Sequence, residues 1–328
     1  MAFIDRFRRR PSIPMPVLIT DPAMGDADIA AMRDLAVASG DWKPAAAYLE
    51  GLEPAAHDRR HMAVDALADA ALRSPAWFEA WRRDRPDAPD MLAVRAEILV
   101  KKAWEARGAG RAEDTGRDAF AEFFRILEQA DRACRAATDA APAHDAVPWV
   151  TWLNAARGQQ LERAVFDRRW AALKERQPQS RAGHYAALQF LCEKWFGSHE
   201  EMFAFARAAA AEAPVGATTK LLPVQAHVEY VLQATHRDES FSRGTYWNSP
   251  AVREELLAAQ AAWEARSEPG PTDLYEYSLL AYAQAQSGRW RETGALFAAA
   301  GHRVFHRPWW YMPDAYLGLV HERVAKDR

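Results

Sequence analysis

The sequence predicts an all-α fold, and three of its features support this fold class. Most stretches of the 328-residue chain carry apolar side chains at positions i, i+3, i+4 and i+7, which is the spacing of one helix face. Runs of alternating or β-branched residues, which would indicate strands, are few. Short connections separate the periodic stretches, so we expect antiparallel helical hairpins.

The periodic stretches define the expected helices in chain order. Ser74 and Ser249 each place a capping hydroxyl before a proline that fits the first helical turn. Gly108 follows a basic last turn and fits a helix C-terminus. The expected ranges are 27–39, 43–52, 58–72, 75–84, 90–107, 115–138, 148–157, 160–177, 182–196, 199–213, 219–236, 250–266, 273–287, 290–300 and 313–326.

Stretches without periodicity suggest how the chain is divided. Residues 1–25 are rich in proline and should form an extended or flexible N-terminal arm. Residues 26–328 should form a single α-helical, repeat-like domain, with a subdivision near 108–118 as an alternative. The stretch 237–249 is the longest candidate for a functional loop in the second half of the chain.

Composition indicates a folded, soluble protein and narrows the choice of partners. Apolar residues make up 49% of the chain, which is enough for a large core. The net charge is −3, from 42 basic and 45 acidic residues, so neither nucleic acid nor a membrane surface is an expected partner. No apolar run approaches the roughly 20 residues that span a bilayer, and we expect a cytoplasmic location.

One helix pair carries a recognisable pattern, "YEYSLLAYAQAQSGRWRETGALFAAAG" at 275–301. Its large, small, turn and aromatic positions are Tyr277, Leu280, Ala281, Gly288, Trp290, Phe297 and Ala300. This spacing resembles the tetratricopeptide repeat. Gly40 and Gly197 fit the same frame less fully, the pair 148–178 fits it with its turn out of register, and the segments between, such as 57–138, do not fit it. The resemblance implies an irregular, right-handed α-solenoid of antiparallel helical hairpins.

Two further motifs are similar to those of a bacterial family of helical proteins classed as a domain of unknown function. They are "AWEARG" at 103–108 and "KWFGSHEEM" at 194–202. This resemblance spans roughly 25–300 of the sequence. It implies a helical fold and carries no substrate or activity.

The stretch "LCEKWFGSHEE" at 191–201 admits two interpretations. In the structural one, Gly197 ends a helix in a left-handed conformation, while Ser198 and Glu201 form a capping box for the next helix. Trp195 would then pack between the two helices. In the functional one, Lys194 and its neighbours His199 and Glu200 face a groove.

The C-terminal stretch "GHRVFHRPWWYMPD" gathers aromatic, histidine and arginine side chains. Such residues are typical of binding hot spots, and also of a helix that caps the end of a solenoid. As a binding surface it would use Arg303, Arg307, Trp309, Trp310 and Tyr311.

No pattern for a metal or cofactor is present in the sequence. The pairs His57/His61 and His302/His306 have helical spacing but lack a third ligand. Cys134 and Cys192 are expected to be small buried side chains. Phosphate loops, dinucleotide fingerprints and hydrolase motifs do not occur. We therefore expect no cofactor, no bound metal and no catalytic residue.

These observations predict a non-catalytic scaffold that binds a protein or peptide on the concave face of stacked helical hairpins. The candidate contact residues are Lys194, Trp195, Arg303, Arg307, Trp309, Trp310 and Tyr311. One alternative is a helical enzyme or small-molecule-binding protein with a pocket lined by Trp, Arg and His between inner helices. A homo-oligomer with apolar self-interfaces is another, since the sequence leaves the oligomeric state open.

Overall fold

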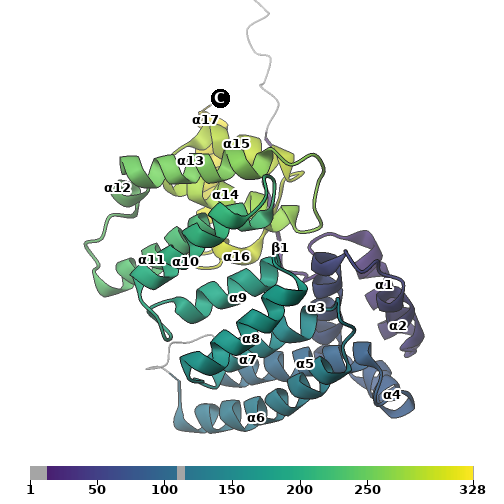
Figure 1. Cartoon of the computed structure of the whole chain (residues 1–328). Helices are drawn as coiled ribbons and strands as arrows, with labels where there is room; N and C mark the ends of the chain where they lie inside the picture. The colour runs from purple at the N-terminus through teal and green to yellow at the C-terminus, as the bar shows by residue number, and fades with distance from the viewer. Residues whose placement is uncertain (1–12, 109–114, 328) are drawn as a thin grey trace, which may run out of the picture.

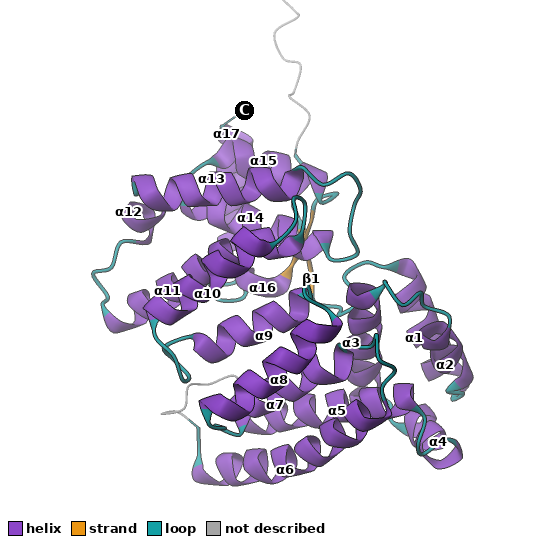
Figure 2. Cartoon of the chain, in the orientation of Figure 1, coloured by secondary structure: helices purple, strands orange, loops and turns teal. Residues whose placement is uncertain are grey.

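The fold is almost entirely helical in the computed structural model, which describes residues 13–108 and 115–327 (Figure 1). Within these ranges it contains 17 α-helices, and about 71% of the residues are helical. Two three-residue strands are the only β-structure of the described chain (Figure 2). The predicted all-α class is confirmed. None of the described helices is both long and apolar enough to cross a membrane.

The first part of the chain forms a helical unit around the pair α5 and α6. Asp26 caps α1 by accepting the backbone N–H groups of Asp28 and Ile29, and Gly40 ends that helix with a φ of 67°. The buried residues of α6 recur every three or four positions, so one face of this long helix packs along α5. The elements are β1 (Val17–Ile19), α1 (Ala27–Ser39), α2 (Lys43–Glu50), α3 (His57–Arg73), α4 (Ala76–Asp84), α5 (Pro89–Arg107) and α6 (Arg117–Ala140).

The second part of the chain is arranged around α14. This helix is buried over most of its surface, because α11, α12, α15 and α16 all pack against it. The elements are α7 (Val147–Gly158), α8 (Arg163–Arg176), α9 (Arg181–Leu191), α10 (His199–Glu212), the 3-10 helix η1 (Thr218–Leu221), α11 (Leu222–Arg237), α12 (Arg243–Trp247), α13 (Pro250–Glu264), α14 (Asp273–Gln286), α15 (Trp290–Ala299), β2 (Arg303–Phe305), α16 (His306–Trp309) and α17 (Tyr316–Lys326).

The helices stack in layers from α5 and α6 up to α13, α15 and α17, as Figure 1 shows. Contacts run in sequence from α5 to α7, then to α9, α11, α14 and α16. Helix α3 lies across this series and contacts α5, α7 and α9. One side of the stack is therefore faced by α3, with α1, α2 and α4 beside it in Figure 1.

The N-terminal segment lies against the C-terminal part of the chain. Strand β1 pairs in parallel with β2, with Val17 opposite Arg303 (Figure 2). Ile13 is buried in the same cluster as α11, α14 and α17, and its carbonyl oxygen lies 2.9 Å from the ring nitrogen Nε2 of His321. Part of the expected arm is thus packed; residues 1–12 and part of the 108–118 loop lie outside the described residues.

All the expected helices occur, with shifted ends, and two short helices were not expected. The stretch 237–249, predicted as a loop, contains α12, which Ser242 caps by accepting the N–H of Thr245 at 3.2 Å. Helix α16 lies in the C-terminal aromatic stretch. The helix predicted over 182–196 ends at Leu191, because the chain folds there into a compact turn.

Candidate functional site

The turn 192–198 joins α9 to α10 and holds two of the predicted contact residues. The amides of Trp195 and Gly197 both donate to the carbonyl oxygen of Cys192, at 2.9 and 3.4 Å. A β-carbon on Gly197 would lie 2.0 Å from the carbonyl oxygen of Leu191, so only glycine fits this close approach. The prediction that Gly197 ends a helix in a left-handed conformation is wrong, because α9 ends at Leu191 and the φ of Gly197 is not positive.

The start of α10 matches only half of the predicted capping box. Ser198 Oγ accepts the backbone N–H of Glu201 at 3.1 Å, as expected for an N-cap. The Glu201 carboxylate instead forms an ion pair with Arg163 at 2.6 Å. His199, a candidate for a groove, lies 2.6 Å from the carboxylate of Glu193. The contacts of Ser198, Glu201 and His199 stabilise the turn, and Lys194 and Trp195 make contacts with other helices.

Trp195 does not pack between α9 and α10 alone but reaches across to α5. Its ring meets that of Trp104 edge to face, with centroids 5.6 Å apart. The guanidinium of Arg157, from α7, lies 4.8 Å from the Trp104 ring and 5.4 Å from the Trp195 ring. Arg107 lies over the same two rings at 5.8 and 6.0 Å. Two arginines and two tryptophans thus share one stack.

This stack contains hydrogen-bond donors that have no acceptor. Arg157 Nε, Trp104 Nε1 and Trp195 Nε1 are all buried and unpartnered. No carboxylate of the described chain forms an ion pair with Arg157. Burial lowers the pKa of Arg157, and the positive charge of Arg307 lowers it further. Buried donors normally have partners, so three orphaned donors in one stack require an explanation.

Lys194 is held in place by a buried carboxylate of α11. Its Nζ lies 2.6 Å from Glu229, which also accepts hydrogen bonds from Gln189 at 2.6 Å and Gln225 at 3.2 Å. Burial acts to lower the pKa of Lys194, but the Glu229 charge raises it above its usual value. Lys194 is therefore a charged, oriented side chain, and its own counter-ion is satisfied.

The C-terminal segment brings Arg307 to the same region. The Arg307 guanidinium lies 4.8 Å from the Trp310 ring, and its Nε is buried without a partner. Tyr311, which is 36% exposed, follows on the same segment. Tyr185 of α9 interacts with these charged groups: burial and Glu229 raise the pKa of its hydroxyl, while the charges of Arg307, Lys194 and Arg157 lower it.

Seven of these residues form one set, and four of them were predicted contact residues: Lys194, Trp195, Arg307 and Tyr311. They come from α5, α7, α9, the turn after it and the segment that begins with α16. We call this set the inner cluster: Trp104, Arg157, Tyr185, Lys194, Trp195, Arg307 and Tyr311.

The carboxylates around the inner cluster already have cations of their own. Asp65 lies 2.6 Å from Lys101, and Glu276 pairs with Arg181. Asp58 accepts the backbone N–H of Arg181 and interacts with its charge. Lys194 is paired with Glu229, but neither Arg157 nor Arg307 forms an ion pair with a carboxylate of the described chain, although the more distant charges of Glu229 and Asp65 act on them.

The structure places other predicted contact residues outside the inner cluster. Trp309 is buried, only 4% exposed, and its Nε1 donates to the carbonyl oxygen of Ser278 at 3.1 Å. It therefore packs in the core of the chain and does not present a surface. Arg303 is exposed on β2 and lies over Gly25. Trp310 is 52% exposed and borders the inner cluster through its contact with Arg307.

The histidines and cysteines of the described residues form no metal-binding group. In the ranges 13–108 and 115–327, no group of three or more His, Cys, Asp and Glu side chains could hold a metal ion. His306 is packed against Phe305, and its pKa is lowered to about 4 by burial and by the Arg307 charge. Both cysteines are buried, and burial raises their pKa values, so thiolate is disfavoured.

Sequence reasoning missed three members of the inner cluster: Trp104, Arg157 and Tyr185. Trp104 lies inside the motif "AWEARG", but nothing in the sequence connects it with Trp195. Polar residues at core positions could have pointed to this site. Arg157 follows two buried alanines, and Gln225 and Glu229 interrupt the apolar face of α11.

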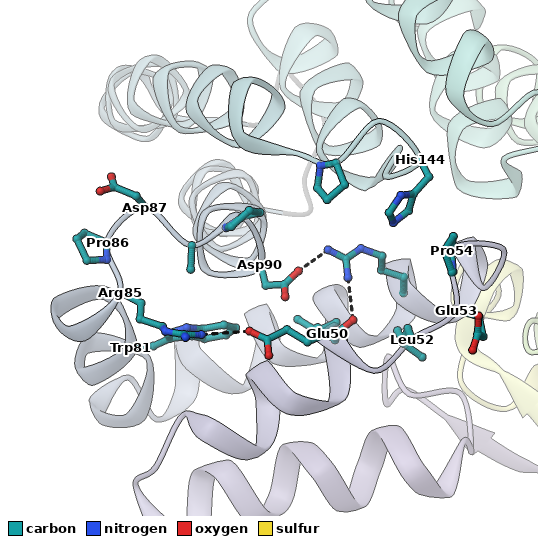
Figure 3. Close-up of a pocket in the computed structure, with 15 residues that line it drawn as sticks. Glu50, Leu52, Glu53, Pro54, Trp81, Arg85, Pro86, Asp87, Asp90 and His144 are labelled. Atoms are coloured by element: carbon teal, nitrogen blue, oxygen red, sulfur yellow. Dashed lines mark hydrogen bonds and ion pairs between the residues drawn. The ribbon is translucent and has the colours of Figure 1, made fainter.

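A separate cavity of about 630 Å³ lies at the N-terminal ends of α3 and α5 (Figure 3). Arg60, which lines it, lies 2.8 Å from Asp145, pairs with Asp90 and donates to the carbonyl oxygen of Leu49 at 3.2 Å. Figure 3 shows Glu50 reaching toward Arg85, with which it forms an ion pair at 3.1 Å. The arginines of this cavity are thus matched by carboxylates or carbonyls, unlike Arg157 and Arg307 of the inner cluster.

Comparison of the chain with protein-family models, with curated protein sequences and with solved structures finds no match. The two family resemblances seen in the sequence therefore stay predictions. The function is inferred below from the geometry of the chain's own residues.

Proposed function

We propose that the chain is a non-catalytic scaffold, an irregular right-handed α-solenoid, that binds a protein or peptide partner through the inner cluster, in the cytoplasm of a bacterium. The observation that carries the proposal is the stack of Arg157 on Trp104 and Trp195 with orphaned donors. Tryptophan, tyrosine and arginine are the residues that dominate binding energy at protein interfaces.

The position of the inner cluster supports the same proposal. Its members come from helices that follow one another in the stack, as the inner faces of solenoid repeats do. Lys194, Trp310 and Tyr311 are exposed, so a partner can reach this region from solvent. The described cysteines are protected by burial, which favours binding over nucleophilic catalysis.

Site-specific photo-crosslinking, carried out in cells that produce the protein, tests the scaffold function. A photoreactive phenylalanine analogue at position Tyr311 should capture one or a few defined proteins. The same analogue at Leu35, which is 55% exposed on α1, is the control and should not capture them. No crosslinked protein, or the same proteins from both positions, would contradict the proposal.

A small-molecule-binding protein is the second candidate function. It is favoured by the burial that raises the pKa of Tyr185, because a recessed polar group suits a small ligand. Native mass spectrometry of the purified protein distinguishes the two functions. A retained small molecule that is absent from an Arg157→Gln variant would support this candidate.

A further inference from the structure

The two arginines of the inner cluster that have no ion pair, Arg157 and Arg307, indicate the chemistry of the partner. We propose that the inner cluster binds an acidic peptide segment, with one carboxylate at Arg157 and the Trp104–Trp195 pair and another at Arg307. This inference rests on the proposed scaffold function and adds the chemical class of its partner.

The geometry at Arg157 suits a carboxylate ligand. Its guanidinium is flanked by the rings of Trp104 and Trp195 at 4.8 and 5.4 Å. Rings that stack on a guanidinium leave its in-plane N–H groups available for a carboxylate. The orphaned indole N–H groups of both tryptophans add two further donors at the same place. Every orphaned polar atom of this stack is a donor, so the missing group must be an acceptor.

The carboxylates around the inner cluster are paired with other cations. Glu229, Asp65 and Glu276 are each paired with a different cation: Lys194, Lys101 and Arg181. Arg157 and Arg307 have no such ion pair within the described ranges. The two lie near each other, since the charge of Arg307 acts on Arg157 and both act on Tyr185. Two neighbouring unpaired cations favour an anionic ligand.

The donors of the inner cluster belong to two sets, one at Arg157 and one at Arg307. Arg157 belongs to α7 and stacks on α5, whereas Arg307 belongs to the C-terminal segment and stacks on Trp310. Donor sets on different elements suit two acidic side chains of an extended segment, and the exposed Trp310 can contact the apolar parts of that segment.

Isothermal titration with defined peptides tests the inference. The probe is a blocked hexapeptide of alternating glutamate and serine, and the neutral control replaces each glutamate with glutamine. The full-length protein should bind the acidic peptide and not the neutral one. Arg157→Gln and Arg307→Gln should each weaken binding by about tenfold or more, since each leaves a carboxylate unpaired.

Arg207→Gln is the matched control variant. Arg207 also lies over an aromatic ring, that of Phe203 at 4.9 Å, but it is paired with Glu255 at 2.7 Å and is far more exposed. It should bind the acidic peptide as the wild type does. Equal weakening by all three substitutions would show a nonspecific effect of net charge and overturn the inference.

Two other outcomes would also overturn the inference. Inorganic phosphate that binds in an Arg157-dependent way, without binding of the acidic peptide, would assign the site to a phosphate ligand. A partner captured from position Tyr311 that binds the Arg157→Gln/Arg307→Gln protein with wild-type affinity would leave the scaffold function intact and reject only the acidic partner.

Discussion

Arg157 and Arg169 are both stacked on tryptophan rings, but only one of them is paired. The Arg169 guanidinium lies 4.0 Å from the Trp152 ring and 2.8 Å from Asp131, and it donates to the carbonyl oxygen of Trp152 at 3.1 Å. Arg157 has the ring contacts without the carboxylate. Arg169 therefore stabilises the fold, whereas the unpaired charge of Arg157 destabilises the fold when no ligand is bound.

Stability measurements should separate these two roles. Arg157→Gln removes a buried, unpaired charge, so the free energy of unfolding should stay the same or rise. Arg169→Gln removes the closer of the two cations of Asp131, leaving only Arg135 at 4.0 Å, and should lower the free energy of unfolding by about 2 kcal/mol. Urea denaturation gives both values. An equal loss in the two variants would mean that Arg157 is a structural residue.

His306 should make stability depend on pH. Burial, then the Arg307 charge, lowers its pKa from 6.5 to about 4 in the folded state. The unfolded chain therefore binds a proton more readily than the folded one between these values, and stability falls as the pH decreases from 6.5 to 4. Asp65, Lys101 and the backbone of Ile19 also act on this ring.

The His306→Gln variant tests this pH dependence. Its free energy of unfolding should fall less steeply than that of the wild type between pH 6.5 and 4, as measured by urea denaturation at several pH values. An identical slope in both proteins would show that His306 is not the group responsible.

At the scale of the element, the turn between α9 and α10 depends on Gly197. Gly197→Ala would place a β-carbon 2.0 Å from the carbonyl oxygen of Leu191, so we expect a loss of about 3 kcal/mol. Gly40→Ala is the control: Gly40 has a φ of 67° but open space around it, and should cost about 1–2 kcal/mol. If Gly197→Ala costs no more than Gly40→Ala, the close approach is not what requires glycine.

Helices could be predicted from sequence because their apolar periodicity is local. Gly40 and Gly288 were assigned to turns correctly, and both have positive φ values. The short helices α12 and α16 were missed, since fewer than two turns carry little periodicity. The end of α9 was also missed, because the residues after Leu191 remain apolar and aromatic while their backbone folds into a turn.

At the scale of the molecule, the N-terminal segment packs against the C-terminal part of the chain. Ile13 is 8% exposed and is buried with α11, α14 and α17. Ile13→Ala should therefore lower the free energy of unfolding by about 2 kcal/mol. Met15→Ala is the control, because Met15 is 53% exposed and should change stability little. Equal effects of the two substitutions would contradict packing of this segment on the C-terminal part.

The inner cluster could be predicted only in part, because it is assembled by tertiary packing. Lys194 and Trp195 stood out as a local cluster, and Arg307 and Tyr311 as part of another. The sequence did not connect these two clusters, nor did it connect Trp104 and Arg157 with them, since the contacts join α5, α7, α9 and the C-terminal segment. Trp309 was included for its residue type, and its burial depends on the position of α14.

The central claim is that Arg157 and Arg307 are left unpaired so that an acidic partner can bind them. The most direct test is thermal or urea unfolding of the wild type and of Arg157→Gln/Arg307→Gln, with and without the glutamate–serine peptide. At a peptide concentration of about 100 times Kd, the wild type should gain about 2.7 kcal/mol, and the double variant should gain nothing while being at least as stable alone. A double variant that is less stable than the wild type and is stabilised equally by the peptide would contradict the account.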